Sequence, residues 1–416
     1  MVSIRTPSGG RSPALIPIIF VTWGIVFLDR MAVLYLAPYI APDLHLSSAQ
    51  VGSLAGVIAL CWAVSALVFG AVSDRVGRKA VLVPMVVLFS ILSAASGLAR
   101  SFDELLLVRA LLGIAEGPCW SVMMALVEES SSAEHRGRDI GIVVSAAAII
   151  GLAIAPVLTT QVAAHFGWRW AFFLAGAPGL IMAVLITVYI PETAGAGAGS
   201  GRATHRVGLR DLLSLLRYRN IWVSAVGAAG FMTWLFLVNA FAPLYITGVE
   251  HQAGTVSGFL MGAAGLGSFF IGLLGPALSD RFGRRMVLAV LGVLCAILPL
   301  ALLTQPLYGH LWWLAAILFV TQGGQAVSAI CIVLVPTESV PRNLVASAIG
   351  FTTMFGEMIG GFAAPIVAGA LVATHGLREP LWLAAGGALV VFVVALALKP
   401  AGRTVEQGVV AVPSQP

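Results

Sequence analysis

Long apolar segments follow one another along almost the whole chain, and short polar stretches separate them. Each segment is close to the ~20 residues that a helix needs to cross a bilayer. The segments cover residues 14–40, 49–72, 80–99, 103–128, 138–163, 168–190, 219–247, 253–278, 286–304, 308–336, 344–374 and 377–398. The pattern predicts an all-α polytopic membrane protein with twelve transmembrane helices.

The composition agrees with this prediction. Of the 416 residues, 59% are hydrophobic and only 10% are charged, whereas soluble domains carry about 25% charged residues. A chain with so few polar groups cannot coat a core of this size for water. The net charge of +5 would suggest a nucleic-acid partner only if its position were ignored, so we expect none.

The positions of the basic residues predict the topology. Twelve spans place both termini on one side, and most of the 23 Lys and Arg residues fall in the tails, linker and loops of that side. Arg100, Arg169 and Arg378 fall on the other side. The positive-inside rule then places both termini in the cytoplasm. We expect an integral plasma membrane protein of the bacterial inner-membrane type, and a monomer within the lipid bilayer.

The chain also repeats itself. GAVSDRVGRKAVL at 70–82 returns about half a chain length later as PALSDRFGRRMVL at 276–288. We therefore divide the chain into an N-terminal arm (1–13), a six-helix bundle (14–193), a linker (194–218), a second six-helix bundle (219–398) and a tail (399–416). The linker begins with a flexible Ala/Gly stretch, and leucines and arginines at helical spacing over 208–220 predict an amphipathic helix on the membrane surface.

These motifs resemble those of the major facilitator superfamily. The repeated Asp-Arg-x-Gly-Arg-[Lys/Arg] is similar to the signature loop of that family. Arg109-x3-Gly113-x3-Gly117 and the Pro191-Glu192-Thr193 run resemble further signatures. The resemblance implies two pseudo-symmetric six-helix bundles around a central cavity, which open alternately to the two sides of the membrane.

The signature loops have a conformational role in this resemblance. Their acids could cap a neighbouring helix, or pair with the arginines across the seam between the halves, and so latch the cytoplasmic side shut. Positive charge that only anchors the topology is the alternative. The latch residues are Asp74, Arg75, Arg78, Asp280, Arg281 and Arg284.

Five ionisable residues lie near the middle of spans: Asp29, Arg30, Arg109, Glu116 and Glu357. Insertion scales assign about 2.5–3.5 kcal/mol to each Asp, Lys or Arg at a helix centre, so these groups must face the protein interior or water. Neighbours in a helix point about 100° apart, whereas residues seven apart share a face. Asp29 and Arg30 therefore need separate partners, and we expect Arg109 and Glu116 to stack beside them along one wall of the first half.

This set of charges resembles the anion:cation symporter branch of the superfamily. The matching segments are FLDR in the first span and LVRALLGIAEGP in the fourth. The resemblance implies that Arg30 binds the carboxylate of an organic anion and that Asp29 and Glu116 carry protons. It also implies that Arg109, at the substrate site, is the counter-ion that senses the protonation state of these two acids. A buried network that only fixes helix packing is the alternative, although such networks are often no more stabilising than apolar residues.

Other candidates keep several interpretations. Glu357 could be a third proton site, a partner for Arg30 across the cavity, or a hydrogen-bonded helix contact. Tyr35, Asn239 and Gln322 could contact the substrate, or they could serve packing and helix–helix hydrogen bonds.

Charge counting predicts the function. With all four first-half groups ionised the wall is neutral, and protonating both acids leaves two uncompensated positive charges. An anion should then bind the protonated protein more tightly. Because linkage is reciprocal, a bound anion should also raise the affinity of the protein for protons. We expect proton-coupled symport of a small carboxylate, such as a sugar acid, hydroxy acid or aromatic acid. A proton-driven exporter and a spinster-like lysolipid carrier are the alternatives. With no enzyme, nucleotide or metal motif, we expect no catalysis, cofactor or metal.

Overall fold

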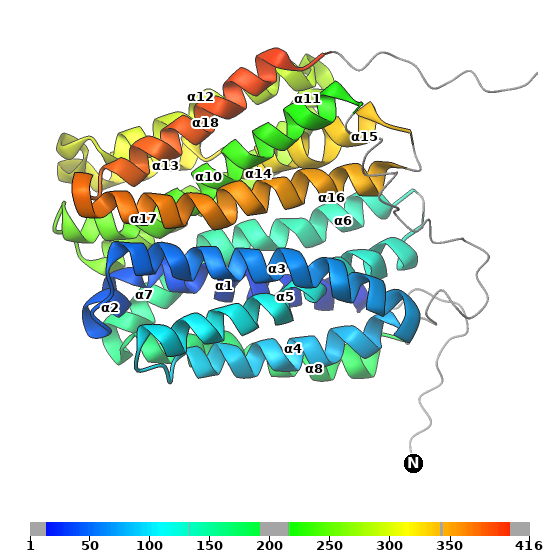
Figure 1. Cartoon of the computed structure of the whole chain (residues 1–416), viewed down its shortest axis with the longest axis horizontal. Coiled ribbons are helices and arrows are strands. Elements are labelled where there is room, and N and C mark those ends of the chain that lie inside the picture. Colours follow the sequence, from blue (N-terminus) through cyan, green and yellow to red (C-terminus); the bar gives the residue numbers. More distant parts are fainter. Residues whose placement is uncertain (1–13, 133, 192–214, 216, 342–343, 400–416) are drawn as a thin grey trace, which may run out of the picture.

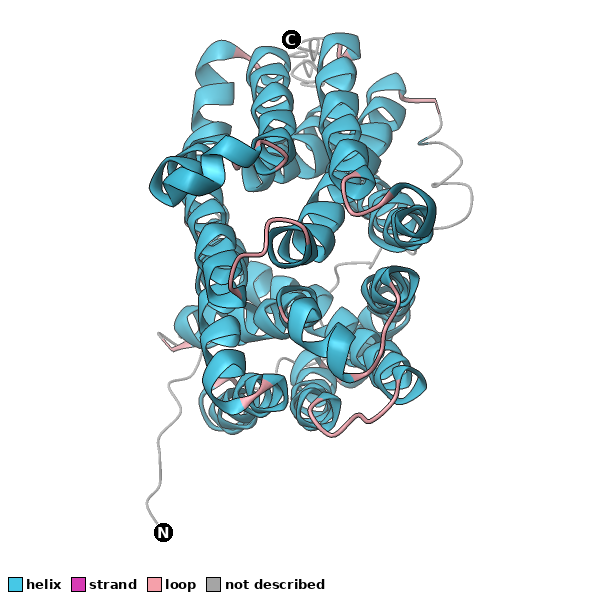
Figure 2. Cartoon of the chain, turned by 90° about the vertical axis from the view of Figure 1, so that its left-hand side faces the viewer, coloured by secondary structure: helices cyan, strands magenta, loops and turns pink. Residues whose placement is uncertain are grey.

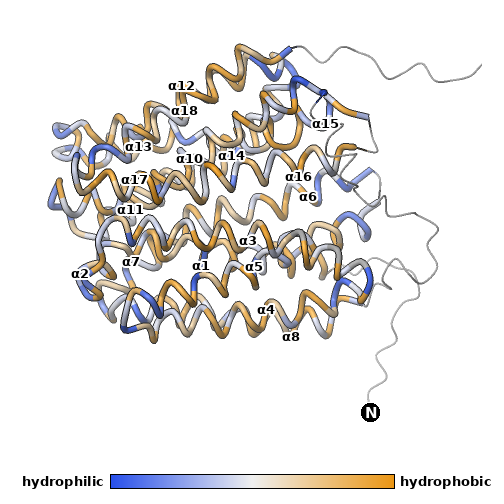
Figure 3. Tube along the Cα trace, in the orientation of Figure 1, coloured by the Kyte–Doolittle hydropathy of each residue, from blue (hydrophilic) through white to orange (hydrophobic). Residues whose placement is uncertain are grey.

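The computed structural model describes residues 14–132, 134–191, 215, 217–341 and 344–399. This part of the chain contains twelve helices that are long and apolar enough to cross a membrane. The helices run nearly side by side, with apolar middles and hydrophilic ends (Figures 1 and 3). The predicted all-α membrane fold with twelve spans is confirmed.

The first six spans form the lower half of the molecule in Figure 1. In chain order their elements are α1 (Leu15–Tyr35), α2 (Ala37–Asp43), α3 (Ser48–Val76), α4 (Arg78–Ser96), α5 (Phe102–Ser130), α6 (Arg136–Ala146), η1 (Ala147–Ile154), α7 (Ala155–Phe166) and α8 (Trp168–Tyr189).

The last six spans form the upper half in Figure 1. Their elements are α10 (Arg219–Gly248), α11 (Gly254–Phe282), α12 (Arg284–Leu302), η2 (Gln305–His310), α13 (Leu311–Thr321), α14 (Gly324–Ser328), η3 (Ala329–Leu334), α15 (Val335–Ser339), α16 (Val345–Gly356), η5 (Glu357–Ala363), α17 (Ala364–His375) and α18 (Glu379–Ala397). The predicted linker (194–218) lies almost entirely outside the described residues, as does most of the amphipathic helix predicted at 208–220.

The signature loops turn sharply between neighbouring spans. Gly77 and Gly283 adopt φ values of 105° and 88°, a region in which a side chain would strain the backbone. Each glycine ends one helix and begins the next, so α3 passes into α4 and α11 into α12 without a longer loop. This geometry explains why the repeated motif keeps a glycine at this position.

The middles of three spans depart from the regular α-helix that the sequence pattern predicts. The segments η1, η3 and η5 are π-helical, and each passes into an α-helix that has a proline in its first turn: Pro156, Pro336 or Pro365. Proline has no backbone N–H and clashes with the carbonyl one turn earlier, so a wider turn before it relieves both problems. Glu357 is the first residue of η5.

The two ends of the bundle differ in charge and packing. We call the end with Arg78 and Arg284 the basic end, and the end with Asp43 the opposite end, which faces the viewer in Figure 2. The halves touch through α3 against α17 and η5, and through α11 against α7 and η1, all in the middle or at the opposite end. Of the described basic-end segments, α6 touches α11 only sparsely. The seam is therefore closed at the opposite end and looser at the basic end.

Glycines make the closed part of the seam possible. A Cβ atom at Gly369 would lie 2.4 Å from the Ser48 backbone oxygen, and one at Gly258 would lie 2.6 Å from that of Pro156. Real Cβ atoms do not approach so closely, so larger residues would push α17 away from α3 and α11 away from α7.

Candidate functional site

The middle of α1 presents Asp29 and Arg30 in different directions, as their adjacency predicts. Asp29 faces the interior of the first half and is fully buried. Its carboxylate accepts a hydrogen bond from Ser93 Oγ on α4 and another, at 3.2 Å, from Arg109 Nη1 on α5. Asp29 and Arg109 thus form an ion pair inside the first half.

Arg109 is enclosed on several sides. Its Nη2 donates to Ser96 Oγ at 3.0 Å, its Nη1 also reaches the Asp29 backbone oxygen at 3.3 Å, and its Cζ lies 4.8 Å from the centre of the Phe172 ring. No part of the side chain is exposed. In this conformation Arg109 pairs with Asp29 and does not present a free face to a substrate.

Arg30 points the other way, into the seam between the halves. Its Nη2 donates to Glu357 Oε2 at 2.9 Å and to Oε1 at 3.1 Å. Both side chains are about 95% buried, at 4% and 5% exposure. Of the interpretations left open for Glu357, the structure shows the one in which it partners Arg30 across the two halves.

Two rings enclose the Arg30 guanidinium. Its Cζ lies 5.0 Å from the Trp62 ring on α3 and 5.3 Å from the Phe236 ring on α10. Such positions favour a cation, because the face of an aromatic ring is electronegative. Among the described residues, Arg30 is therefore contacted by one aromatic ring of its own half, Trp62. From the other half it is contacted by one aromatic ring, Phe236, and by one acid, Glu357.

Glu116 differs from the other four charged residues because its carboxylate has no partner among the described residues. It is fully buried on α5, and neither carboxylate oxygen has a hydrogen-bond partner within the described part of the chain. Asp29, Arg30 and Arg109 lie within electrostatic range. Burying an ionised carboxylate without hydrogen bonds is very costly. This environment therefore favours a proton on Glu116, or a ligand that binds next to it and donates a hydrogen bond.

The signature glycines of α5, on either side of Glu116 in the sequence, face α3. A Cβ atom at Gly117 would lie 2.5 Å from the Trp62 backbone oxygen, and one at Gly113 would lie 2.6 Å from that of Ile58. Without side chains at these positions α5 approaches α3 closely. The spacing of the Arg-x3-Gly-x3-Gly motif thus serves packing next to the buried charges.

The expected single wall of charges is wrong in one respect. Asp29 and Arg109 pair inside the first half, whereas Arg30 pairs with Glu357 of the second half. The 100° between neighbouring residues of α1 sends the two side chains to different surroundings. The charges therefore form two separate pairs, one inside the first half and one across the seam.

The predicted substrate-contacting polar residues are occupied elsewhere. Tyr35 Oη donates to Asn239 Oδ1 at 2.8 Å, which joins α1 to α10 across the seam, and Asn239 Nδ2 donates to the Leu235 backbone oxygen. Gln322 stands at the break between α13 and α14, where its Oε1 accepts from the Gly324 backbone N–H at 3.3 Å. Here all three make structural hydrogen bonds.

The signature-loop arginines pair within their own halves. Arg284 Nη2 lies 2.6 Å from Asp280 and 2.8 Å from Glu338, and Arg78 Nη2 lies 3.0 Å from Glu129. Arg281 lies over the ring of Phe282, and Arg75 is exposed. The Asp74 side chain lies outside the described part of the chain. The expected pairing of Asp280 with these arginines across the seam is therefore wrong for this conformation.

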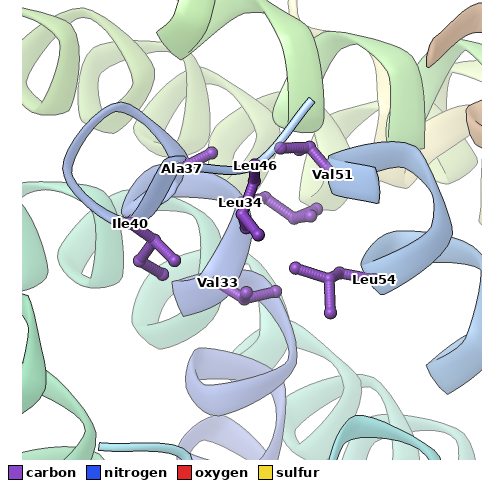
Figure 4. A pocket seen from close by; sticks show the side chains of 7 residues that line it. All are labelled: Val33, Leu34, Ala37, Ile40, Leu46, Val51 and Leu54. Carbon is purple, nitrogen blue, oxygen red and sulfur yellow. The ribbon is translucent and has the colours of Figure 1, made fainter. Parts of the chain in front are cut away.

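Two hollows of the structure lie away from the buried charges. One, at the opposite end, is lined wholly by apolar side chains and leaves no room for water: Val33, Leu34, Ala37, Ile40, Leu46, Val51 and Leu54 (Figure 4). Another, of about 630 Å³, lies at the basic end between α12, α15 and α18. Neither of these two hollows is lined by Arg30, Glu357 or Glu116, and each of these three side chains is buried.

Sequence reasoning missed several residues of this site. Ser93 and Ser96 are small polar residues in an otherwise unremarkable span, and Trp62 and Phe236 belong to no motif. A search for polar residues in the spans that neighbour the charged helices would have found the two serines. The two rings could be found only from their contacts with Arg30.

The comparisons with known proteins agree with this architecture. A family model described as Major Facilitator Superfamily matches residues 19–365. The chain is 29% identical over 361 residues to a probable 4-methylmuconolactone transporter of Cupriavidus pinatubonensis, covering 85% of this chain and 82% of that protein. It is 28% identical over 261 residues to a probable L-galactonate transporter of Escherichia coli, covering 58% and 57%. Among solved structures, a bacterial homologue of the human lysosomal transporter Spinster, inward-facing and unoccupied, superimposes with a TM-score of 0.70 at 19% identity, covering 94% and 95%.

Proposed function

Because the chain belongs to the major facilitator superfamily, we propose that it is a secondary active transporter that carries a small organic anion together with protons. It is an integral membrane transporter and not an enzyme. The anion, the protons and the alternating-access cycle are the parts that we propose. Relatives named as transporters of a lactone acid and of a sugar acid support an organic acid as the substrate.

The ion pair between Arg30 and Glu357 carries this proposal. It joins the two halves at mid-span in a buried site, with N–O distances of 2.9 and 3.1 Å. A carboxylate substrate can take the Nη2 donors of Arg30 only when Glu357 leaves them. Protonating Glu357 removes its charge and frees Arg30, so proton binding and anion binding favour one another.

Glu116 supplies a second proton site in this scheme. Its carboxylate is fully buried without a hydrogen-bond partner among the described residues, and it lies within electrostatic range of Arg30. A proton on Glu116 leaves Arg30 more strongly electropositive toward an incoming anion. Asp29, held by Arg109 and Ser93, is the third acid of the chain of charges and completes the proposed proton sites.

The looser basic end is the proposed entrance from the cytoplasm. The excess of Lys and Arg predicted for that side supports, by the positive-inside rule, a cytoplasmic position for both termini and the signature loops. With the seam packed at the opposite end, this arrangement corresponds to an inward-facing or nearly occluded state. A latch that closes the cytoplasmic side would then be open here, consistent with the loop arginines pairing within their own halves.

Anion-driven proton movement in proteoliposomes tests the proposal. Purified protein is reconstituted with pyranine inside, and benzoate, cis,cis-muconate, D-gluconate or D-glucuronate is added outside. We expect at least one anion to acidify the lumen with wild-type protein and none to do so with Arg30→Gln, beyond the leak of protein-free liposomes. Lumen alkalinisation would indicate exchange of protons for anion, and no response to any of the four would contradict anion–proton symport.

A further inference from the structure

The surroundings of Arg30 are aromatic and apolar. Trp62 and Phe236 lie 5.0 and 5.3 Å from its guanidinium, one from each half, and are 6% and 2% exposed. Next to Glu357, a Cβ atom at Gly361 would meet Ala59 and Phe236 at 3.1 and 3.2 Å. A molecule that replaces Glu357 at Arg30 therefore comes into contact with rings and methyl groups.

Hydroxyl groups of a substrate would find few partners here. The polar pair nearest along α1, Tyr35 and Asn239, is joined by its own hydrogen bond at 2.8 Å. A polyhydroxylated acid needs a hydrogen-bonding partner for each buried hydroxyl, because an unpaired one loses its bonds to water. A flat, unsaturated substrate body makes few hydrogen bonds to water, so it loses few on burial, and it can stack on an aromatic ring.

Two buried donors at this place have no partner within the described residues: Trp62 Nε1 and Arg30 Nε. A buried N–H without an acceptor is unfavourable, and native structures rarely leave one. Both belong to side chains that contact each other, so one ligand with acceptor oxygens could serve both. This observation is independent of the ring positions and fits a ligand with acceptor oxygens beside Trp62.

We propose that Trp62 and Phe236 are the specificity-determining residues of the site and that they select carboxylates with a planar unsaturated or aromatic body. The substrate carboxylate replaces Glu357 at Arg30, the flat body stacks on Trp62 and Phe236, and the indole N–H donates to an oxygen of the substrate. This inference rests on the proposed transport of an organic anion and narrows its chemical class.

Calorimetric binding to purified wild-type protein tests the inference. The aromatic probes are benzoate and 3-phenylpropionate, and the polyhydroxylated probes are D-gluconate and D-galacturonate. Cyclohexanecarboxylate has the size of benzoate but no flat ring. We expect benzoate or 3-phenylpropionate to bind at least about tenfold more tightly than either sugar acid, which corresponds to about 1.4 kcal/mol. Cyclohexanecarboxylate should fall between them.

Variants separate stacking from general packing. Trp62→Leu and Phe236→Leu should each weaken binding of the aromatic probe by about tenfold more than binding of the sugar acids, because loss of a ring beside Arg30 affects every carboxylate but loss of stacking affects only the flat ones. Trp62→Phe keeps a ring but removes the N–H, so its loss should be smaller. Phe172→Leu is the matched control, because Phe172 makes the same kind of ring contact with Arg109, and it should not change the ratio between the two classes.

The outcomes distinguish the inference from the function on which it rests. If a sugar acid binds as tightly as the aromatic probes, the inference is overturned and anion transport stands. If no carboxylate of either class binds or moves protons, the proposed function itself is wrong. If the leucine variants do not fold, the wild-type affinity ratio and Trp62→Phe still decide.

Discussion

Replacing Glu357 with glutamine separates the ion pair across the seam from the rest of the site. The change keeps the size of the side chain and its ability to accept a hydrogen bond, but removes the negative charge that Arg30 faces. Glutamine therefore imitates the protonated acid. In our account Glu357 competes with the substrate for Arg30, so the variant should bind the anion more tightly.

The size of the effect follows from the contact. At 2.9 Å the attraction between two unit charges is about 6 kcal/mol for an effective dielectric constant of about 20. Desolvation offsets much of it, and a hydrogen bond to a charged group contributes about 1.5–3 kcal/mol net. Removing this competitor should tighten anion binding by about 10- to 150-fold. Without ligand, the unpaired buried Arg30 should cost about 3–5 kcal/mol of stability.

Two assays on the same protein check both signs. Isothermal calorimetry with the best-binding carboxylate gives the affinity, and a thermal melt with and without that anion gives the stability and its recovery. We expect Glu357→Gln to melt earlier than wild type when empty, and to gain more from the anion than wild type does. Weaker anion binding together with an unchanged melting temperature would refute the idea that Glu357 competes with the substrate for Arg30. Asp280→Asn serves as a control far from the site.

Three further outcomes are expected. Glu116→Gln should exchange labelled anion across the membrane but not accumulate it under a proton gradient; full accumulation would remove Glu116 from the proton path. Asp280→Asn loses an exposed ion pair with Arg284 that is worth less than about 1 kcal/mol. If the loop is a latch, a probe cysteine in α6 should be labelled faster in this variant than in the wild type. Unchanged labelling together with slower transport would indicate another role for the loop. Hydrogen bonds from Arg169 and then Trp168 lower the pKa of Asp43 below its ordinary 3.8. The small stabilisation, below about 1 kcal/mol, should persist above that value and fade as the pH drops through the lowered pKa, and Asp43→Asn should remove this acid dependence of the melt.

The fold could be predicted from the sequence because its cause is local. Each span is a run of apolar residues whose length matches the bilayer, and the repeated Asp-Arg-x-Gly motif marks equivalent turns in both halves. The breaks inside spans were harder. Pro38, Pro156 and Pro365 lie in segments that the sequence pattern predicts to be continuous helices. Only the structure shows that α1 ends at Tyr35 and that η1 and η5 widen the helix.

The charged residues could be named from the sequence, but not all of their partners. Their cost in lipid identified Arg30 and Glu116, and helix geometry showed that Asp29 and Arg30 must point apart. The pairing of Arg30 with Glu357 joins residues 327 positions apart and depends on how the two halves meet. Trp62 and Phe236 are ordinary core residues until that meeting is known.

The central claim is that the protein binds an anion and a proton together. It is tested most directly by measuring proton uptake when a carboxylate binds to the purified protein in weakly buffered detergent solution. Our account predicts that the pH rises on mixing as the protein takes up protons, and that this rise is absent in the Arg30→Gln variant and reduced in Glu357→Gln. Binding of the anion with no proton uptake, or with proton release, would contradict it.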